Sequence, residues 1–227
     1  MNRIVQMLQL QQSLNDATNG ENWEEGVTKN GKQIDWRRCI YLEAAELIES
    51  YPWKHWKNID ATPDYDNIKI EIVDIWHFIM SEALRLYKVD SLGKIEDIAL
   101  VVANMDEFET FKEENNENQQ LGSYEQIIEV EKMIKILFCN NNINELLVSF
   151  LTMSSKLNLK LPELYKLYIG KNILNKFRQD HGYKEGSYIK VWNKEEDNVV
   201  MQKILEKNEK ITPNSLYNLL EENYPNI

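Results

Sequence analysis

Apolar residues recur at helical spacing along most of the chain. The segment from Ile68 to about Lys88 is apolar on nearly every side, which predicts a long buried helix. Between residues 3 and 16, apolar residues at positions i, i+3 and i+4 predict an amphipathic helix. Asp35 is well placed to cap a helix that runs to Ser50, before Pro52 interrupts it. The same reasoning predicts helices over 95–111, 124–139, 143–157 and 162–181, and weaker ones over 196–206 and from Pro213 onward.

Turn-forming residues are sparse, with 8 Gly and 5 Pro in 227 residues. Sandwiches, barrels and βαβ folds need many turns, so this count favours helices joined by few loops. We therefore predict an all-α fold, a multi-helix bundle built as a single domain over residues 1–227. Within it, 91–120 has no strong motif and is expected to be an insertion or cap. The polar segment 112–122 is expected to be an exposed loop, and 195–227 a tail of helices.

The formal net charge of −11 bears on the choice of partners. Proteins that bind nucleic acid usually present a basic surface, and an anionic membrane surface would repel an acidic protein, so neither partner is expected. No apolar run approaches the length of a membrane span, and the amphipathic N-terminus has no cleavage site, which predicts a cytoplasmic protein. Cys39 and Cys139 lie in apolar stretches and are predicted to be buried, unpaired thiols.

Two pairs of acidic residues lie within helices that are otherwise apolar. Glu43 and Glu46 are three residues apart, as are Glu71 and Asp74, so each pair shares one helix face. Like charges at this spacing repel each other, and burying them is costly. If the two helices pack together, four carboxylates gather in one place, and such hard oxygen ligands suit Mg²⁺. His77 lies three residues further on, at the edge of the same face.

Two other interpretations of these acids stay open. The acids could pair with basic neighbours at a wet surface, and the nearby candidates are Arg37, Arg38, Lys54 and Lys57. They could also belong to a di-iron centre, which in a helical bundle needs Glu-x-x-His on two helices. Only His77 has an acid at that spacing, namely Asp74, so the di-iron interpretation is weak.

The charge reverses locally near the C-terminus. Between Lys166 and Lys190 there are six Lys or Arg residues and two acids, a net charge of +4 in an acidic chain. Lys171, Asn175 and Arg178 follow i, i+4, i+7 and therefore lie on one helix face. Cations beside an amide suit polyphosphate, because Lys and Arg make charge-assisted bonds to phosphate oxygens. A solvated helix face is the alternative.

A set of ordered motifs carries a family resemblance. It begins with LQxxLN over 10–15 and TNGxxW over 18–23. It continues with WRRCIYLEAAELIES, WKHWKN, IEIVDIWHF, YIGKNILNKFRQDHGYKEGSY and KVWNKEEDN. In this order and spacing the motifs resemble the dimeric all-α dUTPases over nearly the whole chain, most closely the epsilon-proteobacterial type. More distantly, they are similar to the MazG-like nucleoside triphosphate pyrophosphohydrolases.

The resemblance implies a helical homodimer that hydrolyses dUTP, and often dUDP, to dUMP with Mg²⁺. It implies that Glu43, Glu46, Glu71 and Asp74 bind two or three Mg²⁺ ions, and that Glu43 or Glu46 accepts the proton of the attacking water. Gln11 and Asn15 would read the uracil edge, Trp56 and His77 would flank the base and deoxyribose, and Asn175 would face the nucleotide. The phosphates would be held by Lys171, Arg178, Tyr183, Lys190 and Asn193.

Each of these roles has a simpler alternative. Gln11 and Asn15 could be polar residues on the surface of an amphipathic helix, and Trp56 could be a core or interface aromatic. His77 could be a packing histidine. At the level of function, the alternatives are a broader (d)NTP pyrophosphohydrolase that also accepts dCTP, and a non-catalytic helical interaction module.

Overall fold

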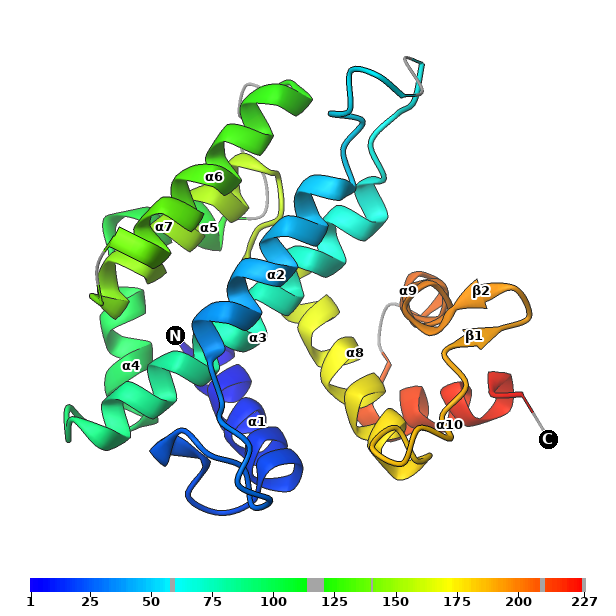
Figure 1. The fold of residues 1–227 in the computed structure, drawn as a ribbon, viewed down its shortest axis with the longest axis horizontal. Helices are drawn as coiled ribbons and strands as arrows, with labels where there is room; N and C mark the ends of the chain where they lie inside the picture. Colours follow the sequence, from blue (N-terminus) through cyan, green and yellow to red (C-terminus); the bar gives the residue numbers. More distant parts are fainter. Residues whose placement is uncertain (58–59, 114–120, 140, 209–210, 226–227) are drawn as a thin grey trace. The chain divides into compact units, whose positions relative to one another are not determined.

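The structure is a computed structural model that describes residues 1–57, 60–113, 121–139, 141–208 and 211–225. The described residues are mainly helical, which confirms the all-α prediction (Figure 1). The longer helices are α1 (Asn2–Asn19), α2 (Trp36–Glu49), α3 (Tyr65–Val89), α6 (Ser123–Cys139), α7 (Ile143–Lys156) and α8 (Leu161–Asp180). The shorter elements are η1 (Trp23–Glu25), α4 (Ile95–Ala103), α5 (Asp106–Lys112), β1 (Val191–Trp192), β2 (Glu195–Glu196), α9 (Asp197–Lys207) and α10 (Pro213–Asn223).

The chain divides into two compact units. Unit 1 comprises Met1–Leu164 and unit 2 comprises Tyr165–Ile227, so the boundary falls within the first turns of α8. This division does not decide how many domains the chain has, so a single domain over residues 1–227 stays a prediction. No helix in the described parts of the chain is both long enough and apolar enough to span a membrane.

Helix α3 is the centre of unit 1. It packs against α1, α2, α4 and α7. Helix α2 runs alongside the N-terminal part of α3 (Figure 1). Asp64 caps α3 by accepting a hydrogen bond from the backbone of Asn67. Trp76 is 1% exposed and stacks on Phe150 of α7, with ring centroids 4.8 Å apart. A helix contacted on several sides must be apolar around most of its circumference, which explains the near-continuous apolar sequence of 68–88.

Unit 2 is a small assembly of α8, the hairpin β1–β2, α9 and α10. The hairpin turns through Asn193 and Lys194, which both have positive φ, as a type I′ hairpin turn requires. At Gly170, an added Cβ would lie 2.6 Å from Met201 Sδ, so α8 and α9 approach closely because this residue lacks a side chain. Phe177 is fully buried among the rings of Tyr188, Trp192, Tyr217 and Tyr224.

Two expectations from the sequence need correction, and one element was not expected. The helix predicted over 95–111 is two helices, because a continuous helix would place Asp106 and Glu109 on the buried face. The break after Ala103 shifts the phase so that Phe108 and Phe111 are buried instead. The hairpin at 191–196 was not predicted. Both cysteines are free, as predicted, but Cys39 is only half-buried and Cys139 is exposed. The loop predicted at 112–122 lies largely outside the described residues.

Candidate functional site

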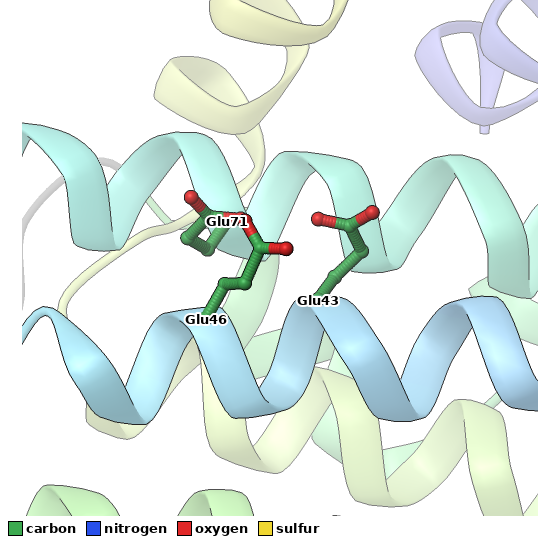
Figure 2. A group of neighbouring side chains, drawn as sticks. All are labelled: Glu43, Glu46 and Glu71. Carbon is green, nitrogen blue, oxygen red and sulfur yellow. The ribbon is translucent and has the colours of Figure 1, made fainter.

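Three carboxylates meet between α2 and α3. One oxygen each of Glu43, Glu46 and Glu71 lies within 4.8 Å of the other two. Figure 2 shows Glu43 and Glu46 on one face of α2, reaching toward α3 and Glu71. The i, i+3 spacing puts the first two on one face, and the packing of α2 along α3 brings in the third. Glu71 is buried, Glu43 half-buried and Glu46 exposed, so the group is accessible from one side.

A hydrogen bond from Asn67 orients the buried member of this group. Asn67 lies one turn before Glu71 on α3, and its Nδ2 donates to Glu71 Oε1 at 3.1 Å. The same nitrogen donates to Ser50 Oγ at 2.8 Å, at the C-terminal end of α2. Asn67 therefore ties the direction of the Glu71 carboxylate to the neighbouring helix. An outer residue that orients a ligand in this way is usual at metal centres.

The fourth predicted ligand is less closely placed. Asp74 lies one turn beyond Glu71 on α3 and is half-buried, but it is not among the three residues whose oxygens lie mutually within 4.8 Å. Its role as a metal ligand stays a prediction.

Three of the four basic neighbours considered as partners of the acids form ion pairs with residues outside the cluster. Arg37 lies 3.4 Å from Glu82, Arg38 lies 3.1 Å from Asp35, and Lys54 contacts Glu49.

The donor set fits a hard divalent cation. Three carboxylates supply oxygen ligands, and their gathering is costly without positive charge to offset it. A pocket of about 460 Å³ lies beside the cluster, and its lining includes Glu46, Glu71, Glu49, Ser50 and Asn67. Mg²⁺ commonly keeps water and phosphate oxygens among its ligands, so open space next to the carboxylates suits it.

A buried hydrogen-bond network links α1 to α3. Gln11 and Asn15 are each 3% exposed, as is His77, and Ser81 is 0% exposed. Gln11 Nε2 donates to Asn15 Oδ1 at 3.1 Å and to Ser81 Oγ at 3.0 Å. Gln11 Oε1 lies 2.6 Å from His77 Nδ1. The surface interpretation of Gln11 and Asn15 is therefore wrong: both amides are buried, and Gln11 contacts the predicted base-flanking histidine.

Trp56 lies in the segment that joins α2 to α3. It is 64% exposed, and its ring makes edge contacts with Trp53 and His55 at 5.6 and 4.8 Å. It is therefore not a core aromatic of the chain. Its role at the base stays a prediction.

The predicted phosphate ligands of unit 2 centre on a buried ion pair. Arg178 binds Asp197 with two parallel hydrogen bonds, from Nε and Nη2, each 2.8 Å long. Asp197 is 0% exposed and lies at the start of α9. Lys171 Nζ donates to Asn198 Oδ1 at 2.9 Å, and Arg178 Nη1 donates to Asn175 Oδ1 at 3.1 Å. The helix face of these residues is thus a connected, buried network and not a solvated face.

The environment of Asp197 favours its charged form. Burial raises the pKa of this carboxyl, but the hydrogen bonds and the charge of Arg178 outweigh burial, so its pKa lies below the ordinary 3.8. Tyr188 donates its hydroxyl proton to Asp197 Oδ2 at 2.8 Å. Burial, followed by the adjacent Asp197 carboxylate, holds the pKa of Tyr188 well above its usual value.

The other predicted phosphate ligands lie around this network with more exposure. Tyr183 is 48% exposed, and the Arg178 guanidinium lies 5.8 Å from its ring centroid. Lys190 pairs with Glu196 at 3.3 Å, across the base of the hairpin. Asn193 is exposed in the hairpin turn. Their binding roles stay predictions.

Four residues of these clusters were not expected from the sequence: Asn67, Ser81, Asp197 and Asn198. For two of them the sequence contains a usable signal, which is their spacing from a predicted site residue. Asn67 precedes Glu71 by four residues, and Ser81 follows His77 by four, so each shares a helix face with a predicted site residue. Asp197 and Asn198 close the KVWNKEEDN motif, but no local pattern shows that one of its several acids is buried.

Comparison with known proteins adds an independent finding. The family model described as dUTPase matches residues 3–183. That range contains the carboxylate cluster, the network of Gln11, Asn15 and His77, and all of α8. The hairpin and Asp197 lie beyond it. A search of the curated proteins gave no match.

Proposed function

Since the chain belongs to the dUTPase family, and is therefore a dUTP diphosphatase, a hydrolase, we propose that its carboxylate cluster is the Mg²⁺-dependent active site. The reaction proposed is hydrolysis of dUTP to dUMP and pyrophosphate, and of dUDP to dUMP and phosphate. The observation that carries this proposal is the approach of three carboxylates from α2 and α3 to within 4.8 Å. Phosphoanhydride hydrolysis requires such a site because charge on the phosphate oxygens must be offset in the transition state.

Glu43, Glu46 and Glu71, joined by Asp74, would hold two or three Mg²⁺ ions. When bound, Mg²⁺ offsets the negative charge on phosphate oxygens and increases the acidity of a nucleophilic water. Within the chain, Asn67 keeps the Glu71 carboxylate directed toward the shared space. Glu43 or Glu46 accepts the proton of the attacking water. The exposure of Glu46 supports this role, because the acceptor must be reachable from solvent and substrate.

The proposed base site is the network between α1 and α3. Gln11 and Asn15 bind the uracil edge, since a carboxamide offers both a hydrogen-bond donor and an acceptor. His77 and Trp56 flank the base and deoxyribose. The burial of the two amides supports this part of the proposal, because hydrogen bonds discriminate most strongly where water is excluded. The exposed face of Trp56 is suited to stacking on a base.

The proposed phosphate ligands lie on α8 and in the segment that follows it. Lys171 and Arg178 contribute positive charge, with Tyr183, Lys190 and Asn193 as further ligands, and Asn175 faces the nucleotide. The support is local: Arg178 and Lys171 are held by Asp197 and Asn198, so part of the entropy cost of fixing two long side chains is already met by folding.

We propose further that the protein is a homodimer. Large apolar side chains on the outer faces of α2 and α6 support this, because a monomer seldom exposes several of them together. Tyr41 and Phe138 are 42% and 61% exposed and contact each other with ring centroids 5.4 Å apart, and Leu42 is 51% exposed. The mass of the chain in solution, measured by light scattering, tests this proposal against the 26.9 kDa of one chain.

The experiment that tests the function is product analysis of the full chain with dUTP and Mg²⁺. We expect dUMP and pyrophosphate in equal amounts, and loss of activity on removal of divalent metal. Glu46→Gln and Glu71→Gln should each lower the rate by about 10²- to 10⁴-fold. Glu131→Gln is the matched control, since it makes the same change on an exposed position of α6 and should leave the rate unaltered. Near-normal hydrolysis in both site variants would contradict the proposal.

A further inference from the structure

Ser81 lies at the centre of the network that links α1 to α3. Its hydroxyl contacts three polar groups and its side chain is fully buried. The hydroxyl donates to the backbone oxygen of His77 at 2.9 Å. It accepts from Gln11 Nε2 and from Asn15 Nδ2, both at 3.0 Å. A serine hydroxyl has one proton and two lone pairs, so these three bonds use its whole capacity.

The backbone carbonyl determines the direction of every other bond in the network. A carbonyl oxygen only accepts, so the single proton of Ser81 must point at His77 O. The Ser81 oxygen can then only accept, and both groups that face it must be the NH₂ ends of their carboxamides. Asn15 Oδ1 consequently faces Gln11 Nε2 at 3.1 Å, and Gln11 Oε1 faces His77 at 2.6 Å. Because Gln11 Oε1 only accepts, the Nδ1 atom of His77 carries a proton.

A flipped Asn15 amide would be penalised twice in this arrangement. Its Oδ1 would face the Ser81 oxygen, which has no proton to give, and its Nδ2 would face the NH₂ group of Gln11. An unsatisfied or opposed buried polar group destabilises the folded state. Each end of the Asn15 amide still has capacity for one bond beyond those that it makes to described residues.

We infer that Ser81 is a positioning residue that sets the pyrimidine specificity of the site by fixing the orientation of the Asn15 amide. This inference rests on the proposed function, in which Gln11 and Asn15 bind the base edge. Uracil presents a ring N–H beside a carbonyl, which pairs with an amide in one orientation. Cytosine presents a ring nitrogen acceptor beside an amino group, which pairs only with the flipped amide. Ser81 therefore acts against cytosine without touching the base.

The test compares Ser81→Ala and Ser81→Cys with the unmodified chain. Alanine removes the hydroxyl, and cysteine replaces it with a group of similar shape that is a weak acceptor. Ser154→Ala is the matched control, because Ser154 is also a fully buried helical serine that donates to a backbone carbonyl, at Leu159. For each protein, kcat/KM is measured for dUTP and dCTP, and calorimetry gives the Kd of dUMP and dCMP.

We expect the unmodified chain and Ser154→Ala to share a high dUTP-to-dCTP ratio. In both Ser81 variants the ratio should fall by about 10-fold or more, and the dUMP-to-dCMP ratio of binding should fall with it. If Ser81→Ala does not fold, Ser81→Cys carries the test alone.

Three results would overturn the inference. A folded Ser81 variant that keeps the full ratio shows that the amide is fixed by other groups. An equal loss for both nucleotides shows a merely structural role. An unmodified chain that does not prefer dUTP shows that the network does not discriminate. Absence of dUTP hydrolysis by the unmodified chain is a different outcome, which removes the proposed function together with the inference.

Discussion

In unit 1 the carboxylates of Glu43, Glu46 and Glu71 gather within 4.8 Å of one another, whereas in unit 2 the carboxylate of Asp197 lies 2.8 Å from two nitrogens of Arg178. The first arrangement brings like charges together, which opposes folding, and this is why we propose that the cluster binds a cation. The second pairs opposite charges with good geometry while both are buried. The comparison teaches that a buried acid can lower or raise the stability of the fold, depending on the sign of the charges beside it.

The largest expected effect concerns the pair in unit 2. Asp197→Ala leaves the Arg178 guanidinium buried without its partner, so the free energy of unfolding should fall by about 3–5 kcal/mol. Chemical denaturation followed by circular dichroism measures it. Asp180→Ala is the control in the same unit, because Asp180 is exposed and its carboxylate accepts a hydrogen bond from the exposed hydroxyl of Tyr217. A loss below about 1 kcal/mol for the control is expected. Equal losses in the two variants would show that the buried Asp197 carboxylate stabilises the fold no more than the exposed Asp180 carboxylate does.

The same pair predicts a pH dependence. The folded pKa of Asp197 lies below 3.8, so its contribution to stability is fully present above that value and is lost as the pH falls through the folded pKa. Unfolding of the unmodified chain should therefore become easier below about pH 4. Asp197→Asn should show a shallower fall over the same range, which parallel denaturation curves from about pH 3 to pH 6 would reveal. Identical slopes would mean that other carboxyl groups govern the acid response.

A smaller effect is expected at Asn67, whose side chain donates a hydrogen bond to the carboxylate of Glu71. Asn67→Ala removes the hydrogen bond to Glu71 Oε1 while keeping every carboxylate in place. Mg²⁺ affinity should fall by about 10- to 100-fold, the range usual for outer residues of metal centres. Calorimetric titration with Mg²⁺ measures this directly, and Asn144→Ala on the exposed side of α7 serves as the control. Unchanged affinity in Asn67→Ala would show that Glu71 is oriented by packing alone.

The smallest effect has the opposite sign to that of Asp197. In the absence of divalent metal, Glu46→Gln relieves repulsion between Glu43 and Glu46, so it should stabilise the folded chain by about 0.2–0.5 kcal/mol. Adding Mg²⁺ should reverse the order of stability, because the cation binds the unmodified site better. Denaturation curves with and without Mg²⁺ provide both values. A destabilising effect of Glu46→Gln without metal would indicate that the cluster is held together by protein contacts.

The features of this protein that its sequence predicts are those that depend on local spacing. Helical periodicity is enough to locate α1, α2 and α3, and the i, i+3 spacing is enough to place Glu43 and Glu46 on one helix face. Spacing alone cannot bring Glu71 next to them, because that depends on how α2 packs along α3. Periodicity also predicts one helix over 95–111, where the burial of Phe108 requires a break.

Local spacing along the sequence does not predict contacts between distant segments. Ser81 meets Gln11 and Asn15 across at least 66 residues, and Arg178 meets Asp197 across 19. In both cases a short polar side chain is buried by tertiary packing, and nothing in its immediate neighbours indicates that burial. The structure therefore adds residues that contact the proposed site residues, whereas the proposed site residues themselves come from the sequence and from the family resemblance.

The most direct test of the central claim is calorimetric titration of the full chain with Mg²⁺, compared with the double variant Glu46→Gln/Glu71→Gln. The account predicts saturable binding by the unmodified chain and a loss of at least about 100-fold in affinity in the double variant, with its helical circular dichroism retained. Mg²⁺ binding of equal affinity in the two proteins would contradict the assignment of the carboxylate cluster as the metal site.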